Sequence, residues 1–313
     1  MIFSNGIYFS ANDFYRSLFG KKVYKVSVDA GCTCPNRDGT KGFGGCIFCS
    51  ALGSGDFVQG KNEEVEVQLE RGMAFVSRKI KEPAFIAYFQ SFTNTYGNPR
   101  RLIDLYERAV NYPGVVGLAV GTRPDCLDDE ILDYLDRLSE KFFVSVELGL
   151  QTINERSVEY INRCYHNEEY DRAVRILREK CPRVHVVTHL IFGLPNETER
   201  DMLSAVDHCV KAGTHGIKIS LLHVLRGTRL FEDYERGLFK TMDMEEYFSV
   251  LGKALCLIPE NIVVHRLTGD GPKKILAAPL WTADKKKVLN SMMEYFRKQG
   301  VFQGNNEYFS GKK

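Results

Sequence analysis

The sequence contains none of the long apolar stretches that membrane-spanning or secreted chains carry. Its 313 residues include no run of about 18 or more apolar residues, which is the length that a membrane-spanning helix requires. The segment from Met1 to Ser10 also lacks a basic stretch followed by an extended apolar one, as a secretory leader would have. We therefore expect a soluble, cytoplasmic protein of one or two domains with no membrane partner.

Net charge is low as well, only +2 at pH 7, but positive charge gathers at one end of the chain. Residues 261–313 contain ten Lys or Arg against four acids, which leaves the remainder at about −4. Basic side chains beside aromatic ones suit RNA, whose bases stack on rings. A lysine-rich helix with its aromatic residues in the core would give the same pattern. The aromatic residues concerned are Trp281, Tyr295, Phe296, Phe302, Tyr308 and Phe309.

The nine cysteines do not resemble a disulfide framework. Five are isolated in the sequence and fit buried apolar positions or spare thiols: Cys126, Cys164, Cys181, Cys209 and Cys256. The other four, Cys32, Cys34, Cys46 and Cys49, lie in one short run directly after the strand-like residues 22–30. Thiolates are the ligands that iron-sulfur clusters and zinc prefer, so this run predicts a metal site.

The spacing of these cysteines leaves the kind of metal site open. Several glycines in the run allow the loop to fold back so that its sulfurs converge. Three thiolates on a four-iron cluster would leave one iron free to bind a substrate or cofactor. Four thiolates, with Cys32 included, would instead complete a tetrahedral structural zinc site.

Apolar periodicity predicts alternating strands and helices. Short apolar runs indicate six buried strands, at 22–30, 84–89, 115–120, 142–150, 184–192 and 216–224. Helices are expected at 65–80, 98–110, 127–138, 154–163, 168–179 and 197–212, the last capped by Asn196. This alternation favours an α/β fold, a partial (β/α)6 TIM-like barrel with a parallel sheet. We expect an N-terminal segment over 1–17, the barrel core over 18–270 and a helical, basic extension over 271–313.

Polar residues follow the predicted strands. In α/β barrels the ligand site lies at the carboxyl edge of the sheet, so residues just past each strand should converge there. These residues are Gln90 to Tyr96, Gly121 to Asp125, Glu147, Gln151, and Gly193 to Glu197. The sequence therefore predicts one polar pocket at this edge.

Five short motifs occur in the sequence in this order: Cys34-Pro, Cys46-Ile-Phe-Cys49, Thr122-Arg-Pro-Asp125, Val146 to Thr152, and Phe192 to Glu197. Taken together, these motifs resemble the radical S-adenosylmethionine (SAM) superfamily. They are similar to the branch related to the catalytic core of the Elongator Elp-three proteins, over about residues 18–270. Residues 265–281 are similar to a compact bacterial subgroup of that branch. The resemblance favours an iron-sulfur cluster over zinc.

The resemblance implies that Cys34, Cys46 and Cys49 ligate a [4Fe-4S] cluster. Cys34 is preferred to Cys32 because Pro35 follows it, as in the related proteins. The amino and carboxylate groups of SAM would chelate the free iron, and an electron from a reductase such as flavodoxin or ferredoxin would cleave the sulfonium. The resulting 5′-deoxyadenosyl radical would take hydrogen from an unactivated C–H bond inside a dry barrel.

Further residues are implicated in cofactor binding by position. Phe48 resembles the aromatic residue near the adenine, although it could simply shield the cluster from water. Gln90, Ser91 and Thr93 occupy the place where related enzymes hold the methionyl amino group, although the usual Gly-Gly-Glu is absent.

Charged residues past the third and fourth strands are also candidates. Arg123 could neutralise a carboxylate or pair with Asp125. Glu147 or Gln151 could bind ribose hydroxyls, or Glu147 could cap a neighbouring loop; a carboxylate inside an apolar strand needs a polar partner. No catalytic residue is assigned, although three histidines could carry protons or be satisfied core residues: His189, His223 and His265.

The resemblance also suggests the substrate. Elongator relatives act on the wobble uridine of tRNA, but with about 30 residues after Trp281 we expect no acetyltransferase domain. We expect conversion of carboxymethylaminomethyl-uridine to aminomethyl-uridine, with tRNA and no DNA as partner. Two alternatives stay open: a radical SAM enzyme acting on a small acidic or porphyrinogen-like molecule, and a non-enzymatic zinc-binding RNA adaptor.

Overall fold

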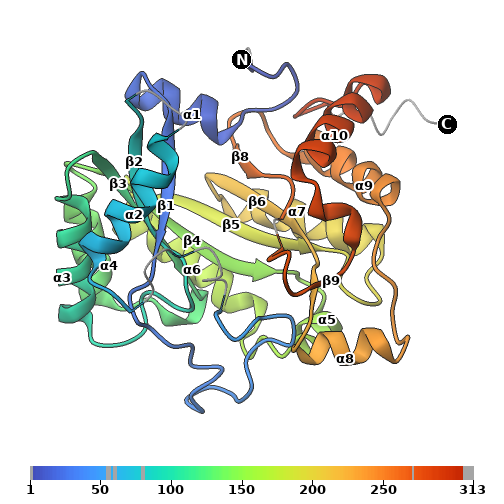
Figure 1. Ribbon diagram of the computed structural model, residues 1–313, viewed down its shortest axis with the longest axis horizontal. Helices are drawn as coiled ribbons and strands as arrows, with labels where there is room; N and C mark the ends of the chain where they lie inside the picture. The colour runs from blue at the N-terminus through green and yellow to red at the C-terminus, as the bar shows by residue number, and fades with distance from the viewer. Residues whose placement is uncertain (1–2, 54–57, 59–61, 79–81, 270, 306–313) are drawn as a thin grey trace.

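Helices wrap one curled parallel sheet in the computed structural model, which describes residues 3–53, 58, 62–78, 82–269 and 271–305 (Figure 1). The sheet order is β1-β2-β3-β4-β5-β6-β8, and every pair is parallel. β1 and β8 are edge strands, so the barrel is open on one side. The strands are β1 Val23–Val28, β2 Ala84–Phe89, β3 Val115–Thr122, β4 Phe143–Gln151, β5 His185–Phe192, β6 Gly216–Leu221 and β8 Val263–Arg266.

The predicted partial TIM-like barrel is confirmed, with one strand more than expected. All six predicted strands are present, and the last of them divides into β6 and the short β7, Val224–Leu225. β7 pairs with β9, Leu276–Ala278, in a separate two-stranded sheet. The added strand, β8, was not predicted because its four residues are too few to give a periodic pattern.

The helices follow the expected alternation, and no helix among the described residues is both long and apolar enough to cross a bilayer. Ile80, at the end of the first predicted helix, lies outside the described residues. The helices are α1 Ala11–Phe19, α2 Val65–Ser77, α3 Pro99–Val110, α4 Asp129–Leu138, α5 Glu155–Tyr160, α6 Asn167–Lys180, α7 Glu199–Ala212, α8 Arg229–Glu235, α9 Met244–Leu257 and α10 Lys285–Gln299, with single 3-10 turns at η1 Pro124–Cys126 and η2 Leu280–Ala283.

The predicted cap of α7 was wrong. Asn196 lies two residues before the true cap, in a left-handed conformation with φ 66°. Thr198 caps the helix, because its hydroxyl accepts a hydrogen bond from the backbone N–H of Asp201 while the Asp201 carboxylate accepts from Thr198. This reciprocal capping box forms with Asp at the third helical position.

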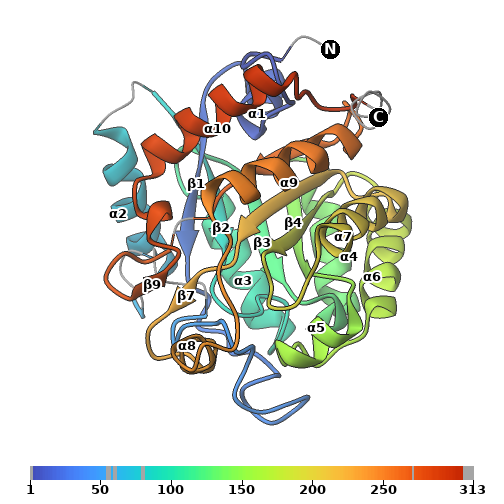
Figure 2. The same cartoon turned by 90° about the vertical axis from the view of Figure 1, so that its right-hand side faces the viewer.

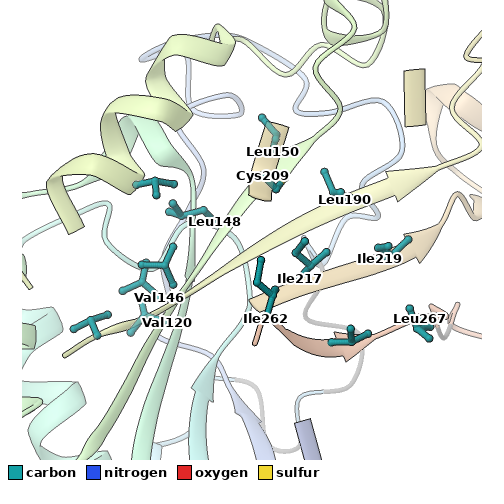
Figure 3. Close-up of a cluster of buried hydrophobic side chains, with 14 of the residues drawn as sticks. Val120, Val146, Leu148, Leu150, Leu190, Cys209, Ile217, Ile219, Ile262 and Leu267 are labelled. Atoms are coloured by element: carbon teal, nitrogen blue, oxygen red, sulfur yellow. The ribbon is translucent and has the colours of Figure 1, made fainter. Parts of the chain in front are cut away.

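The two faces of the sheet differ in polarity. Because side chains alternate along a strand, one set points to the helices and the other into the barrel. The outward set is apolar and forms the main core with the helices; Figure 3 shows Val120, Val146, Leu148, Ile217 and Ile219 in this cluster. Toward the carboxyl ends of the strands, inward positions carry polar residues instead, among them Glu147, His189 and Lys218. The barrel interior is therefore built to hold polar groups.

The amino ends of the strands are covered by α1. Tyr15 packs there with Ile86 and Ala119, and the ring of Phe14 stacks on His185 at 4.7 Å. α1 also contacts β1 and β8. The capping box at Ser10 fixes the start of this helix. The interior is thereby plugged at this end, which leaves the carboxyl ends of the strands for a ligand.

The C-terminal extension packs back on the barrel, with α10 alongside α9 (Figure 2). The Trp281 ring lies 6.0 Å from that of Tyr247, and Phe296 is completely buried. Of the aromatic residues considered for base stacking, Trp281, Tyr295 and Phe296 thus serve the core, whereas Phe302 is 46% exposed. Tyr308 and Phe309 lie outside the described residues.

Candidate functional site

A cavity of about 450 Å³ opens at the carboxyl ends of the strands. It brings together nine of the predicted site residues: Cys34, Cys46, Phe48, Cys49, Gln90, Thr93, Arg123, Glu147 and Gln151. Ser91 does not line the cavity; it is completely buried, and its hydroxyl has no hydrogen-bond partner among the described residues. The volume is typical of a site for a small-molecule cofactor and substrate.

The cysteine loop is held in place by the segment between α5 and α6. The Asn162 amide donates hydrogen bonds to the carbonyls of Phe43 and Gly45, at 3.0 and 2.9 Å. The backbone N–H of Ile47 donates to the Ile161 carbonyl at 3.1 Å. Gly45 has φ 74°, and a Cβ there would lie 2.8 Å from the Arg37 side chain, so glycine is required.

Two of the three predicted cluster ligands contact each other. A hydrogen bond from Cys46, with Arg37 nearby, lowers the pKa of Cys49, and the same bond together with burial raises the pKa of Cys46. Cys34 lines the same cavity and is half-buried. A low pKa favours the thiolate, which is the form that binds metal.

Cys32 lies apart from the other three. It is 9% exposed, is not part of the cavity wall, and its Sγ is 3.7 Å from an Arg101 nitrogen. Burial raises the pKa of Cys32 to about 11. In the described part of the chain, no three His, Cys, Asp or Glu side chains are preassembled around a single metal ion.

Arg123 is paired within the protein. Its guanidinium donates two hydrogen bonds to the Asp125 carboxylate, at 2.9 and 3.0 Å, and a third to the Arg163 carbonyl at 3.0 Å. Lys41 also contacts Asp125 at 2.7 Å. A ligand carboxylate would therefore have to share Arg123 with Asp125.

The wall near β2 and β4 is also hydrogen-bonded internally. The Gln90 side-chain oxygen accepts a bond from the Ser27 hydroxyl at 3.0 Å. The Gln151 side-chain oxygen accepts one from the Tyr165 hydroxyl, also at 3.0 Å, and Gln151 has φ 63°. Thr93 is 1% exposed beside them. These contacts keep the amide groups of Gln90 and Gln151 at the cavity wall.

Glu147 is the centre of a polar cluster deep in the barrel. Its side chain is completely buried and pairs with Lys25 through one oxygen. The other oxygen lies 2.5 Å from His189 Nε2, 2.8 Å from the Tyr88 hydroxyl and 3.2 Å from Lys218 Nζ. The carboxylate thus has the polar partners that its place in a strand requires.

Burial and charge act in opposite directions in this cluster. Burial would raise the pKa of Glu147, but the Lys218 and Lys25 ammonium groups hold it well below its ordinary value. Burial lowers the pKa of Lys218 to about 8 and that of His189 to about 4. Glu147 is therefore an anion and His189 a neutral imidazole at neutral pH.

Sequence reasoning did not single out Lys25, Tyr88, Lys218 or Arg266. Lys25, Tyr88 and Lys218 lie on predicted strands, where a single polar residue is easily overlooked, and Arg266 lies on β8, which was not predicted. The sequence did contain a signal for two of them, because side chains two residues apart on a strand point to the same face. Lys25 and Ser27 form one such polar pair, and Lys218 and Ser220 form another. Of the three candidate histidines, His189 joins the cluster and His265 pairs with His185 at 3.0 Å.

A half-barrel of parallel strands with a three-thiol loop after its first strand, open at the carboxyl edge, defines an enzyme of the radical SAM class. Residues 34–209 match the model of the Radical SAM superfamily, and residues 214–298 match the Radical_SAM C-terminal domain. The chain belongs to the radical SAM superfamily, and its relatives lie in the Elp3-like branch.

Three similar proteins show how much of the chain its relatives share. The chain is 39% identical to the uncharacterized protein YtqA of Bacillus subtilis over 95% of its length and 92% of that protein. It is 26% identical to the tRNA uridine(34) acetyltransferase of Methanocaldococcus jannaschii, over 59% of this chain and 34% of that one. The solved Elp3 of Methanocaldococcus infernus has the same fold, with a TM-score of 0.68, 19% identity, and 92% and 68% of the two chains covered.

The cofactors follow from the family, whose members use a [4Fe-4S] cluster and SAM. The spacing of the cysteines left open whether the site holds zinc or an iron-sulfur cluster, and membership of this family decides for the iron-sulfur cluster. The residues present fit these groups, because three thiols and several basic side chains share one cavity. When bound, the cluster and SAM supply one-electron cleavage of the sulfonium and removal of hydrogen from carbon; the barrel supplies orientation and exclusion of water.

Proposed function

We propose that the protein converts carboxymethylaminomethyl-uridine to aminomethyl-uridine at the wobble position of tRNA. The observation that carries this proposal is the similarity of its radical SAM core to a protein named for tRNA uridine(34). The cavity supports it, since a side chain projecting from a flipped base can enter a pocket that a folded RNA cannot. The protein acts in the cytoplasm.

The proposed reaction breaks the bond between the amine nitrogen and the carbon of the carboxymethyl group. The methylene between nitrogen and carboxylate is oxidised to an imine, and water then releases the primary amine and glyoxylate. Bound SAM would supply the oxidising equivalents, and methionine and 5′-deoxyadenosine would be its products, the latter carrying the hydrogen taken from the methylene. An electron from a reductase such as flavodoxin or ferredoxin starts the cycle and is returned when the imine forms, so the electrons balance.

Residue roles follow from position in the cavity. We assign cluster binding to Cys34, Cys46 and Cys49, and contact with the adenine of SAM to Phe48, which lines the same cavity. We assign contacts to SAM to the cofactor-binding residues predicted above. Five of these line the cavity, namely Gln90, Thr93, Arg123, Glu147 and Gln151, and the sixth, Ser91, lies behind the lining. Ser91 would reach SAM only if its hydroxyl turned toward the cavity. Glu147 would have to share its oxygens between a ribose hydroxyl and its present donors.

The test is a comparison of modified nucleosides in tRNA from a deletion strain and its parent. We expect carboxymethylaminomethyl-uridine to accumulate in the deletion strain and aminomethyl-uridine derivatives to disappear. A plasmid carrying the Cys34→Ala variant should not restore them, whereas Cys181→Ser, which alters a buried cysteine far from the cluster loop, should. An unchanged wobble profile in the deletion strain would refute the proposal.

A small acidic molecule is the second candidate substrate, because basic residues outnumber acids in the cavity wall. The two candidates differ in their requirement for RNA. A tRNA-modifying enzyme should bind tRNA at low salt and lose affinity steeply as salt rises. An enzyme for a small acid should show no such binding.

A further inference from the structure

The inner wall of the cavity carries more positive than negative charge. Lys218 and Arg266 line the cavity together with Glu147, and Lys25 pairs with the Glu147 carboxylate without lining the cavity. These described residues thus bring three cations and one carboxylate to the inner end of the barrel. His189 is neutral, because burial lowers its pKa to about 4. Since charges removed from water must be compensated, this surplus calls for an anion from outside the protein.

Glu147 cannot balance all three cations. One of its oxygens is occupied by Lys25, and the other already accepts from His189 at 2.5 Å and from Tyr88 at 2.8 Å. Lys218 reaches this second oxygen only at 3.2 Å. Of the two lysines that pair with Glu147, Lys218 is thus held by the longer contact.

Arg266 lies next to Lys218 on the neighbouring strand. The two are Cα partners across β6 and β8, and both line the cavity. The Lys218 side chain is 12% exposed, so its ammonium group is reachable from the cavity. Among the described residues, no carboxylate forms an ion pair with Arg266. Arg266 therefore presents its guanidinium to a ligand.

We propose that Lys218 and Arg266 bind the carboxylate of the substrate inside the barrel. The inference rests on the proposed function in one respect: the ligand is the carboxymethylamino group of the modified base. Arginine and lysine side by side are the groups that proteins use for carboxylates. Lys25, Tyr88 and His189 hold Glu147, and Glu147 in turn keeps Lys218 at the wall.

This placement would determine which hydrogen is taken. The methylene that reacts is bonded directly to the carboxylate carbon, so fixing the carboxylate fixes that methylene. The phosphates of an RNA backbone are a poorer fit, because the pair lies inside the barrel and not on an exposed face. Lys218 and Arg266 are thus specificity-determining residues.

The test uses the anaerobically reconstituted holoenzyme and two small probes. N-benzylglycine has the carboxymethylamino group on a ring, and N-benzylglycinamide has nearly the same shape but an uncharged carboxamide in place of the carboxylate. Calorimetry should show that the wild type binds the acid about tenfold or more tightly than the amide. Lys218→Met and Arg266→Gln should each abolish that preference, and Lys218→Arg should restore part of it. Lys211→Met, which alters an exposed lysine on α7, should leave it intact.

The same variants separate a substrate site from a SAM site. SAM affinity, measured in parallel, should change less than about threefold in Lys218→Met, since the pair is assigned to the substrate. Equal binding of acid and amide by the wild type would overturn the inference, and so would a loss of SAM affinity in step with acid affinity. Thermal unfolding of each variant identifies any that fail to fold. If Lys218→Met does not fold, Lys218→Arg is compared with the wild type instead. A preference of Lys218→Arg for the acid that is as strong as that of the wild type would count against the site.

Failure of this inference and failure of the proposed function give different results. If the wild type prefers the acid but leaves tRNA from the deletion strain unchanged, the carboxylate site stands and the tRNA reaction is wrong. If the wild type converts the tRNA and Lys218→Met does so with an unchanged KM, the reaction stands and the site is wrong.

Discussion

Glu147 is the residue on which the barrel interior depends most. A carboxylate without solvent exposure is stable only when donors replace water, and here Lys25, Tyr88, His189 and Lys218 do so. The cost of burying this charge is met by residues from four other strands. Loss of the charge would leave their cations facing one another.

Glu147→Gln tests that dependence because it keeps the shape of the side chain but removes the charge. We expect the free energy of unfolding to fall by about 3 kcal/mol, since Lys25 and Lys218 lose their counter-ion. Urea denaturation measures the change. Glu199→Gln is the control, because Glu199 pairs with Lys253 on the surface and should cost less than about 1 kcal/mol. Equal losses in the two variants would show that burial adds nothing to the importance of Glu147.

Lys218 is the group of this cluster that titrates just above neutral pH. Burial lowers its pKa from 10.5 to about 8. Burial and Glu147 raise the pKa of Tyr88, and Glu147 raises that of Lys25 despite burial, so both stay protonated at that pH. The charged and titratable groups that face Lys218 are Lys25, Tyr88, Glu147, His189, His265 and Arg266.

The depressed pKa of Lys218 predicts how stability changes with pH. Between about pH 8 and pH 10.5 the unfolded chain holds the Lys218 proton and the folded chain does not, so stability rises with pH in that window. Below about pH 8 both states are protonated and the cost of burying the charge is fully present. We expect the wild type to gain about 1–3 kcal/mol relative to Lys218→Met between pH 8 and pH 10. Urea titrations at several pH values measure this, and a constant or shrinking difference would contradict it.

At the scale of elements, the strands could be predicted well and the shortest pieces could not. Buried strands such as β2 are uniformly apolar and bounded by turn residues, so residues 84–89 were located without error. β8 was not predicted because its four residues are too few to show a periodic pattern of apolar side chains. The start of α7 was misplaced because Asn196, Thr198 and the acids after them all suit a helix terminus, and only tertiary structure shows which one caps it.

The cysteine loop depends on an element that lies far away in the sequence. Asn162, after α5, donates both amide hydrogens to the loop and has φ 55°, a conformation that glycine also adopts. The sequence does not indicate this contact, because the partners are more than a hundred residues apart.

Asn162→Gly removes the amide while tolerating the backbone, so it tests whether this anchor retains the cluster. We expect the reconstituted variant to lose iron to a chelator several-fold faster than the wild type, because a looser loop exposes the cluster. Global stability should fall by only about 1–2 kcal/mol, the worth of its hydrogen bonds. The control is Asn111→Gly, since that amide only bonds its own helix end. If both variants lost iron at the same rate, the Asn162 side chain would have no specific role in retaining the cluster.

At the scale of the whole molecule, the cavity is the product of the topology. Seven parallel strands deliver their carboxyl ends to one place, and α1 closes the other end of the barrel. This explains why the cysteines and the polar residues after β2, β3 and β4 could be predicted to share one pocket. The prediction was wrong for Gly193 to Glu197, which follow β5 and line a second pocket instead. The excess of positive charge inside the barrel could not be predicted in the same way. Lys25, Lys218 and Arg266 lie on separate strands, so they come close together only in the folded, curled sheet.

The central claim is that three thiols hold a four-iron cluster with one iron left for SAM. Anaerobic reconstitution followed by reduction with dithionite in the presence of SAM tests it most directly. The account predicts about four iron and four labile sulfide per chain, with release of 5′-deoxyadenosine and methionine. Cys32→Ala should keep both properties and Cys34→Ala should lose them. Wild-type protein that holds no labile sulfide, or that holds the cluster but releases no 5′-deoxyadenosine, would contradict the account.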